Sequence, residues 1–289
     1  MELLRTNSFK IIGRLKSQDL KVGRKDNGEG YISGKAIIIS NLDGRDNEFE
    51  VSFYTNQLTK DKKESQLFIT YSNLESLVGK KVEVTGELRE SRFWSRASNQ
   101  MVSAQQLSGR FIRGTTESSI DEGSFELGGF VIEELKEKKN KDNEVYRYDL
   151  ALGQSNYSGT SMSRFVVHVD PNEREIVNGV RSYRIGQTVR VNGDLRFIVN
   201  IVTSTASNEG GFGSGVTRTF TNKIHSFFVR GGTAPIADAA QGMYSSDVVR
   251  SLVAAYKARD VELSAKAKDS GADAVEEAAP VSSRQTSLI

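Results

Sequence analysis

One short stretch of the chain combines aromatic and cationic side chains in a polar setting. Residues 90–99 read ESRFWSRASN and hold the only tryptophan, Trp94, next to Phe93 and between Arg92 and Arg96. A flat ring at a surface can stack on a nucleic-acid base, and nearby guanidinium groups can neutralise phosphates. Because no apolar run surrounds this tryptophan, the segment favours stacking. Packing of the ring back onto the protein is the alternative.

Further aromatic and basic residues could take part in the same chemistry. Arginines that follow a V-x-V-x-G-x-L pattern are candidates for phosphate contact, with an ion pair to Glu87 or Asp194 as the alternative. Tyrosines near expected strand ends could stack, although a tyrosine in a strand more often packs with its hydroxyl at the rim. The full set of candidate nucleic-acid-binding residues is Trp94, Phe93, Arg92, Arg96, Arg89, Tyr31, Lys35, Tyr54, Tyr146, Arg147, Tyr148 and Arg196.

The sequence gives little support to catalysis. Cysteine is absent, which excludes disulfides, thiol catalysis and thiolate metal sites. The segment GGFGSG (210–215) lacks the Lys-Ser/Thr ending of a phosphate-binding loop. The two histidines, His168 and His225, lie far apart, and no acidic pair has the spacing of a metal site. We therefore expect a binding protein that is not an enzyme and that uses no cofactor and no metal.

Charge is distributed unevenly along the chain. The formal net charge is +2, but residues 1–115 hold 19 Lys+Arg against 14 Asp+Glu, whereas residues 116–235 hold 14 against 15. The first part is therefore the better candidate site for a polyanion. No stretch reaches the roughly 18 apolar residues of a membrane span, and the start MELLRTNSFK lacks the apolar core of a signal peptide. We expect a cytoplasmic protein without membrane contact.

The chain contains an internal repeat. GKKVEVTGELR and GQTVRVNGDLR share six of eleven positions, and two further blocks match in the same order. The matched pairs are 79–89 with 186–196, SFKIIGRL (8–15) with SFELGGFV (124–131), and GRFIRG (109–114) with SFFVRG (226–231). The repeat predicts a first domain at 1–115, a second domain at 116–235, and a C-terminal region at 236–289.

Each copy has the pattern of a small β-domain. KVEVTGEL alternates apolar and polar residues, and Gly86 within it indicates a bulge or a sharp bend. Short helices are expected at 65–79 and 171–186, between the third and fourth strands of each copy. This order predicts an all-β chain of two tandem five-stranded OB-fold Greek-key barrels.

Polar and C-terminal segments complete this expected organisation. The loops expected between strands 1 and 2 and between strands 4 and 5 are 21–30, 136–144, 90–100 and 200–218. Residues 245–268 have apolar residues at helical spacing, and the chain after Asp269 is expected to be a flexible tail. The helix is expected to pack on its own chain, with packing on a second copy in a homo-oligomer as the alternative.

The block GKKVEVTGELRESRFW resembles the fourth strand and following hairpin of bacterial and phage single-stranded DNA-binding proteins. The resemblance implies an OB fold, single-stranded DNA as the ligand, and a role in DNA replication, recombination or repair. It also makes the C-terminal region the candidate contact for replication or recombination proteins. However, the chain ends SSRQTSLI, without the acidic, aromatic-ended tip of that family, and the second copy has no tryptophan at the equivalent place.

Two other functions stay open on the sequence alone. OB barrels also serve as non-catalytic structural or assembly proteins, because a fold does not fix a function. An OB-containing subunit of an enzyme whose catalytic chain is another protein is the third hypothesis. Binding to oligonucleotides separates the first hypothesis from the second, and co-purification of a polymerase, primase or recombinase would favour the third.

Overall fold

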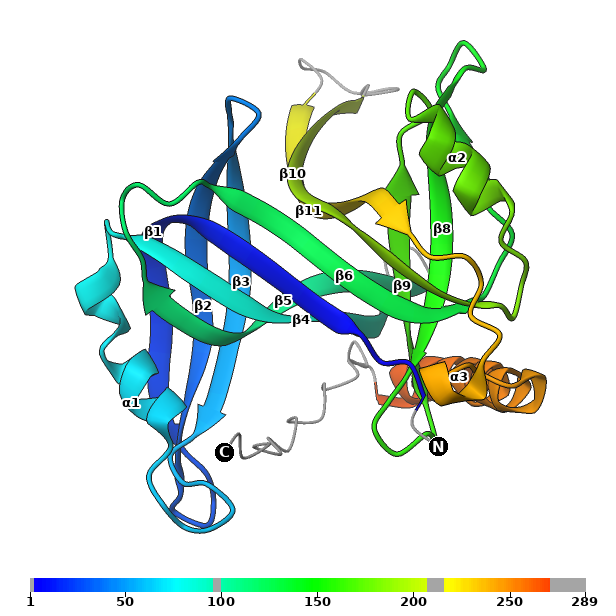
Figure 1. Cartoon of the computed structure of the whole chain (residues 1–289). Coiled ribbons are helices and arrows are strands. Elements are labelled where there is room, and N and C mark those ends of the chain that lie inside the picture. Colours follow the sequence, from blue (N-terminus) through cyan, green and yellow to red (C-terminus); the bar gives the residue numbers. More distant parts are fainter. Residues whose placement is uncertain (1–2, 96–99, 207–215, 271–289) are drawn as a thin grey trace.

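The structure, a computed structural model, describes residues 3–95, 100–206 and 216–270. Its strands and helices follow the chain from blue to red in Figure 1. The first half contains β1 (Asn7–Arg24), β2 (Gly30–Leu42), β3 (Arg45–Asn56), α1 (Gln66–Ser72), a 3-10 helix (Leu74–Leu77), β4 (Lys81–Ser95) and β5 (Gln100–Gly114). The second half contains β6 (Glu122–Val131), β7 (Lys136–Lys139), β8 (Val145–Ser155), β9 (Met162–Val169), α2 (Arg174–Arg181), β10 (Thr188–Ala206) and β11 (Val216–Gly232). A second 3-10 helix (Ala239–Gln241) and the long helix α3 (Ser246–Ser270) follow.

The strands form one 11-stranded sheet that closes on itself at two places. In the first half the order β2-β3-β5-β4-β1 is closed by pairing of β1 with β2. In the second half the order β6-β10-β11-β9-β8 is closed by pairing of β6 with β8, and β7 lies outside β8. These two rings, here called the first and second barrels, confirm the prediction of five-stranded OB-fold barrels. The domain boundaries drawn from the repeat stay a prediction.

The barrels are joined by antiparallel pairing of β1 with β6, which are equivalent strands of the repeat. Phe9 pairs with Phe125, and these are the residues that the repeat aligns with each other. The joint is therefore close to two-fold symmetric, as in the self-complementary interface of a homodimer. Figure 1 shows the two strands running side by side across the middle of the molecule.

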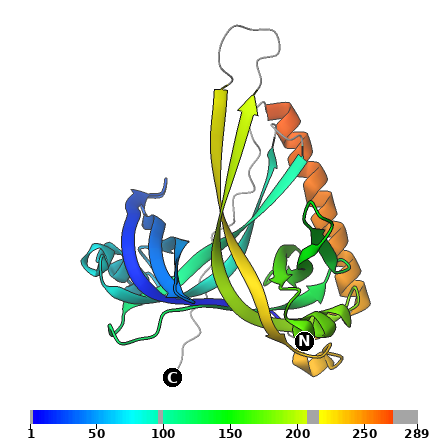
Figure 2. The same cartoon turned by 90° about the horizontal axis from the view of Figure 1, so that it is seen from above.

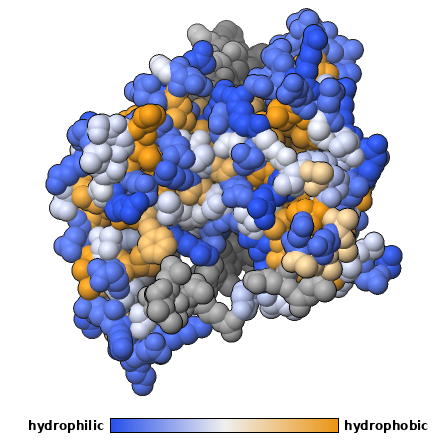
Figure 3. All heavy atoms as spheres, in the orientation of Figure 1, coloured by the Kyte–Doolittle hydropathy of each residue, from blue (hydrophilic) through white to orange (hydrophobic). Residues whose placement is uncertain are grey.

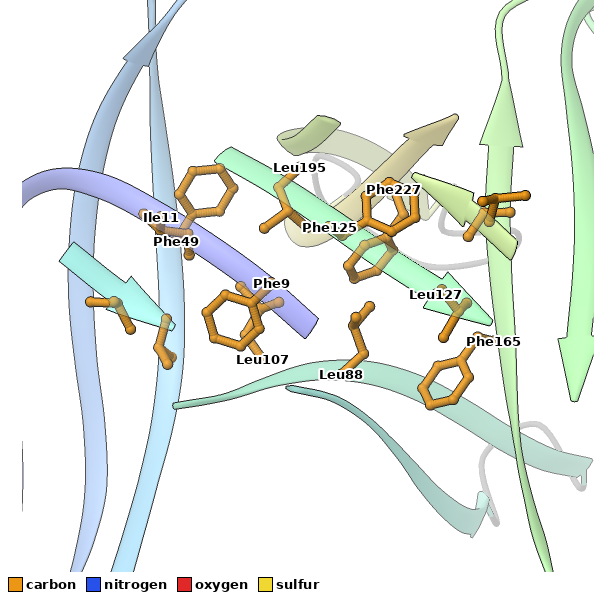
Figure 4. Close-up of a cluster of buried hydrophobic side chains, with 14 of the residues drawn as sticks. Phe9, Ile11, Phe49, Leu88, Leu107, Phe125, Leu127, Phe165, Leu195 and Phe227 are labelled. Carbon is orange, nitrogen blue, oxygen red and sulfur yellow. The ribbon is translucent and has the colours of Figure 1, made fainter. Parts of the chain in front are cut away.

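A single hydrophobic core runs through both barrels. Figure 4 shows Phe9, Ile11, Leu88 and Leu107 of the first half in one cluster with Phe125 and other residues of the second. The rings of Phe125 and Phe227 meet edge to face with centroids 5.6 Å apart. Because alternate residues of each strand point inward, the period-two pattern read in the sequence is also the pattern of burial.

The segments expected as loops are largely strand. β1 continues to Arg24 and β2 begins at Gly30, so half of 21–30 belongs to a two-stranded ribbon and 25–29 form its turn. In the same way, β4 and β5 extend through much of 90–100, β10 and β11 extend into 200–218, and Lys136–Lys139 forms β7. Backbone pairing in a ribbon does not need an apolar face, so polar composition alone is a poor guide to where a strand ends.

The short helices and the C-terminal helix form where they are expected. Within 65–79 and 171–186 lie α1 and α2, and α3 covers the predicted 245–268. Figure 2 shows α3 along the outside of the second barrel. Its Leu252 is buried in a second cluster with Leu4, Phe130 and Tyr244, so the helix packs on its own chain. None of the helices in the described ranges has the length and hydropathy that a bilayer crossing requires. The expected tail lies outside the described residues.

The bulge predicted at Gly86 lies on the opposite strand: the extra residue is Arg110 of β5, and Arg230 of β11 has the same place opposite the repeat partner Gly193. The register shifts between Thr85 and Gly86 in one barrel and between Asn192 and Gly193 in the other. A side chain at either glycine would collide with a backbone carbonyl of the neighbouring strand, that of Ser108 or of Phe228. Both barrels therefore bend at a position where the next strand leaves no room for a Cβ.

The registers also correct one match of the repeat. Gly86 pairs with Gly109, whereas Gly193 pairs with Val229. Gly109 thus corresponds to Val229, and the alignment of GRFIRG with SFFVRG, which matched Gly109 to Ser226, is wrong by three residues. The two blocks resemble each other by chance at this offset, and the sequence alone does not show which residues the strand pairing makes equivalent.

Replacing Gly86 by alanine is expected to destabilise the protein by about 1–3 kcal/mol, the usual cost of overpacking a well-filled site. The new methyl group would press on the Ser108 carbonyl and the ring of Phe9. Gly179→Ala in α2 is the matched control, because a Cβ there meets nothing within 4 Å and alanine favours a helix. Urea unfolding curves measure both effects. Equal stability of the two variants would contradict the account of the bulge.

Candidate nucleic-acid interface

Two tyrosines form an aromatic pair on the outer surface of the first barrel. Tyr31 of β2 and Tyr54 of β3 are stacked with ring centroids 5.9 Å apart and an interplanar angle of 27°. Both point outward because their neighbours Ile32 and Phe53 point into the core. Tyr54 is 39% exposed, and its hydroxyl donates a hydrogen bond of 2.8 Å to Asn56. A flat ring surface therefore faces solvent on strands that the barrel holds in place.

A glycine on the adjacent strand makes room for this pair. Gly23 of β1 pairs with Tyr31, and a Cβ at Gly23 would collide with the tyrosine ring. The tyrosine therefore lies flat across the ribbon instead of standing away from it. We call the outer surface of Gly23, Tyr31 and Tyr54 the tyrosine platform.

Lysines flank the tyrosine platform on the same outer face. Lys35 follows Tyr31 by four residues on β2, and it forms an ion pair of 2.6 Å with Glu50 on β3. Lys21 on β1 lies 3.3 Å from Asp19. All four side chains are at least half exposed, and such surface pairs contribute about 0–1 kcal/mol. A phosphate could therefore replace either carboxylate at small cost.

The ribbon of β4 and β5 crosses to α3 and the second barrel, and it places Arg92 differently from the expectation. Instead of facing solvent, Arg92 is 4% exposed, pairs with Asp260 of α3, and lies 3.6 Å from the ring centroid of Tyr256. Glu90 beside it is also buried and accepts hydrogen bonds from the Tyr256 hydroxyl and the backbone N–H of Arg164. Arg92 therefore links β4 to the C-terminal helix instead of standing free at the surface.

Burial changes the acid–base properties of this buried cluster. Desolvation raises the pKa of Glu90, and hydrogen bonds, the first from Tyr256, partly offset that rise. Desolvation and the adjacent carboxylate also raise the pKa of Tyr256. The sequence could not predict this buried cluster, because nothing in ESRFWSRASN indicates that Arg92 and Glu90 contact a helix more than 160 residues away.

The remaining aromatic residues of this ribbon lie on opposite faces. By strand alternation Trp94 shares the face of Glu90 and Arg92, which α3 covers, and it is half-buried. This position fits the packing alternative better than an exposed ring. Phe93, also half-buried, points to the other face with Arg89, whose guanidinium hydrogen-bonds Glu87 at 3.1 Å. Arg96 lies outside the described residues.

The candidates of the second barrel do not form a comparable surface. Tyr146 is 53% exposed, but Tyr148 is buried and its hydroxyl accepts a hydrogen bond from Arg181. Arg147 is in an ion pair of 2.8 Å with Asp149. The last candidate, Arg196, lies between Asp43 and Asp194, at 3.5 Å and 3.6 Å, and over the ring of Phe228.

One side chain of each barrel also hydrogen-bonds the backbone of a strand of the other barrel, a feature that the sequence analysis missed. Gln105 of β5 bonds both the N–H and the C=O of Val166 on β9. His225 of β11 accepts a hydrogen bond of 3.2 Å from the N–H of Glu50 on β3. The registers make His225 the counterpart of Gln105 and Glu50 the counterpart of Val166. The two contacts are thus a symmetric pair made by different residue types.

His225 is expected to make stability depend on pH, because it accepts this bond only when neutral. Burial against Phe49 and Phe197 lowers the pKa of His225 to about 4. The unfolded chain, with an ordinary histidine pKa near 6.5, takes up the proton first. Stability should therefore fall as the pH drops from about 6.5 to about 4, by up to about 3 kcal/mol.

Urea unfolding over this pH range, for the native chain and for His225→Gln, measures the effect. Glutamine keeps an acceptor but does not titrate, so the difference in stability between the two proteins should change with pH in the stated direction. A difference that stays constant across the range would contradict the role given to His225.

In the described part of the chain, no cluster of three or more histidine, cysteine or acidic residues could hold a metal ion. The surface in Figure 3 is mixed, with hydrophobic residues in scattered groups among hydrophilic ones. The arrangement therefore offers stacking rings and charged side chains, which suit a binding surface.

The fold is the OB architecture that single-stranded DNA-binding proteins also have. The single-stranded DNA-binding protein of Thermus aquaticus has a similar fold, with a TM-score of 0.50 and 15% sequence identity over 81% of this chain and 96% of that one. A deletion variant of the same protein gives the same TM-score and identity, over 81% and 97%. The chain belongs to the YorF family, whose model matches residues 5–268. No curated protein matches the sequence.

Proposed function

We propose that this protein binds single-stranded DNA, largely without sequence preference, on the outer surface of β1, β2 and β3. The observation that carries the proposal is the tyrosine platform, a pair of rings held on rigid strands beside Lys21 and Lys35. Each base has a flat face, so stacking on such rings does not distinguish one base from another. The fold shared with single-stranded DNA-binding proteins is consistent with this function.

Affinity on such a surface has two sources. Base–aromatic stacking contributes about 1–3 kcal/mol per base. Each phosphate neutralised by a lysine adds a dependence on salt, with a slope of about −0.7 in log K against log salt for single strands. Because the lysines first have to leave Glu50 and Asp19, stacking should provide most of the affinity and the salt slope should be shallow.

The role that follows is protection of single strands during DNA replication, recombination or repair, without catalysis. Phe93 and Arg89, on the outward face of the β4–β5 ribbon, are the second candidate contacts of this proposal. Arg92 and Tyr148, which were candidates in the sequence analysis, are left out of the proposed binding surface because both are buried. A homo-oligomer, a partner protein at the C-terminal region and a cytoplasmic location are also proposals.

The test is a titration of a dye-labelled oligo-dT with the full chain, followed by fluorescence anisotropy at low and high salt. Saturable binding that weakens with salt, with similar affinity for oligo-dT and mixed sequences, would support the proposal. The intrinsic fluorescence of Trp94 gives a second signal from one known place, since the chain has no other tryptophan. Absence of binding at low salt would reject the proposal and favour a structural or assembly role.

A further inference from the structure

The paired strands allow the outer faces of the two barrels to be compared position by position. Leu88 and Leu195 are equivalent in the repeat, and they pair with Leu107 and Phe227. The next residues of these partner strands are Ser108 and Phe228. Ser108 pairs with Ser52 in the first barrel, and Phe228 pairs with His168 in the second. Ser52 of β3 and His168 of β9 therefore occupy equivalent positions.

The same steps reach the neighbouring strands. Ser52 pairs with Lys35 on β2, whereas His168 pairs with Asp149 on β8. Counting along β3 and β9 from these pairs places Asp170 of the second barrel where the first barrel has Tyr54. On β8 the count ends at a bulge: Lys138 of β7 pairs with Arg147 and Lys139 with Val145, so Tyr146 is an extra residue without a partner on β7.

Among the described residues of β7, β8 and β9, no pair of rings matches the tyrosine platform. Asp170 takes the place of Tyr54, and its carboxylate repels the phosphates that a bound strand would bring close. Val145 packs against the hydrophobic core. Tyr146, the bulged residue, is 53% exposed, but it is a single ring, and the guanidinium of Arg147 lies 5.7 Å from its centroid.

The centre of the second face is filled by an ion-pair network. Asp149 lies 2.8 Å from both Arg147 and His168, and 3.9 Å from Lys138. Burial alone would raise the pKa of Asp149, but the hydrogen bond with His168 and the adjacent cations hold it below its usual value. Arg147 and Lys138 of this face are thus already paired with a carboxylate that is only 12% exposed.

We propose that the two barrels have divided their roles: the first stacks bases, and the outer face of β7, β8 and β9 in the second barrel does not. The inference rests on the proposed function and deepens it, because it assigns the ligand to one of two surfaces of the same origin. The ion-pair network stabilises the second barrel at the place where the first barrel binds. One chain accordingly engages a short segment of single strand, within the roughly 4–16 nucleotides that a single OB fold covers.

The test compares the native chain with one variant of each face. Tyr146→Ala removes the exposed ring of β8, and its affinity for a short oligo-dT is expected to stay within about twofold of native. Tyr31→Ala/Tyr54→Ala removes the tyrosine platform, and it is expected to weaken binding about thirtyfold or more. Occluded length is measured by titrating oligo-dT of increasing length, and thermal unfolding shows that each variant is folded.

The outcomes separate this inference from the function itself. If the native chain binds no oligonucleotide, the proposed function fails. If the native chain binds and Tyr146→Ala weakens binding about fivefold or more, both faces contribute and the division of roles is overturned. Binding close to native by a folded Tyr31→Ala/Tyr54→Ala variant would overturn it as well. A native occluded length clearly beyond the roughly 4–16 nucleotides of a single OB fold would also count against it.

Discussion

Replacing Tyr31 and Tyr54 together by alanine is expected to weaken binding of a short oligo-dT by about thirtyfold or more. Each ring that stacks on a base contributes about 1–3 kcal/mol, and no other ring of the β1–β2–β3 surface can replace this pair. The side chains point outward from strands whose inner residues fill the core, so their removal should leave the fold intact. Fluorescence anisotropy with a labelled oligonucleotide measures the loss.

Two matched controls make this prediction specific. Tyr31→Phe/Tyr54→Phe keeps both rings and removes both hydroxyls, so its affinity should stay close to native if stacking is the source of binding. Tyr157→Ala removes a tyrosine that is 69% exposed in the loop between β8 and β9, away from the platform. Loss of binding in the phenylalanine variant would assign the affinity to the hydroxyls, and equal loss in Tyr157→Ala would deny the platform a special role.

Replacing Arg92 by alanine is expected to destabilise the protein by about 3–5 kcal/mol, the usual cost of removing one partner of a buried ion pair. The substitution leaves the buried carboxylate of Glu90 without its adjacent guanidinium and removes the link from β4 to Asp260 on α3. It also removes the cation from the ring of Tyr256, 3.6 Å away. The midpoint of urea unfolding, followed by Trp94 fluorescence on the same strand, measures the change.

The control for this prediction is an arginine of α3 that forms an exposed ion pair. Arg250 pairs with Asp247, with side chains 80% and 91% exposed, and Arg250→Ala should change stability by no more than about 0.5 kcal/mol. A similar small change in Arg92→Ala would mean that α3 is held by its apolar contacts alone. In that case Leu252, buried at 1% exposure, would be the main anchor of the helix.

The sequence allowed most of the fold to be predicted because its signals were short-range and repeated. The alternation of KVEVTGEL, the glycine within it, and its second copy at 186–196 specify a bent strand used twice. The lengths of the ribbons were not predictable in the same way. Strands such as β10 and β11 continue beyond the barrel because their backbones pair with each other, and polar side chains leave no pattern that marks this.

The candidate site was predictable only where exposure follows from alternation. Tyr31 and Tyr54 were among the candidates because polar neighbours surround them, and strand geometry brings them together. Arg92 has polar neighbours as well, but its surroundings are set by α3, which begins more than 150 residues later. A residue covered by a distant segment looks the same in the sequence as one that faces solvent.

The joint between β1 and β6 has a consequence for how the two halves can diverge. In a dimer of identical chains every substitution appears on both sides at once, and dilution separates the subunits. Here Phe9 and Phe125 meet within one polypeptide, so the halves stay together at any concentration and each can mutate without the other. The covalent connection thus releases the second copy from keeping the surface of the first, while the shared core of Figure 4 continues to constrain both.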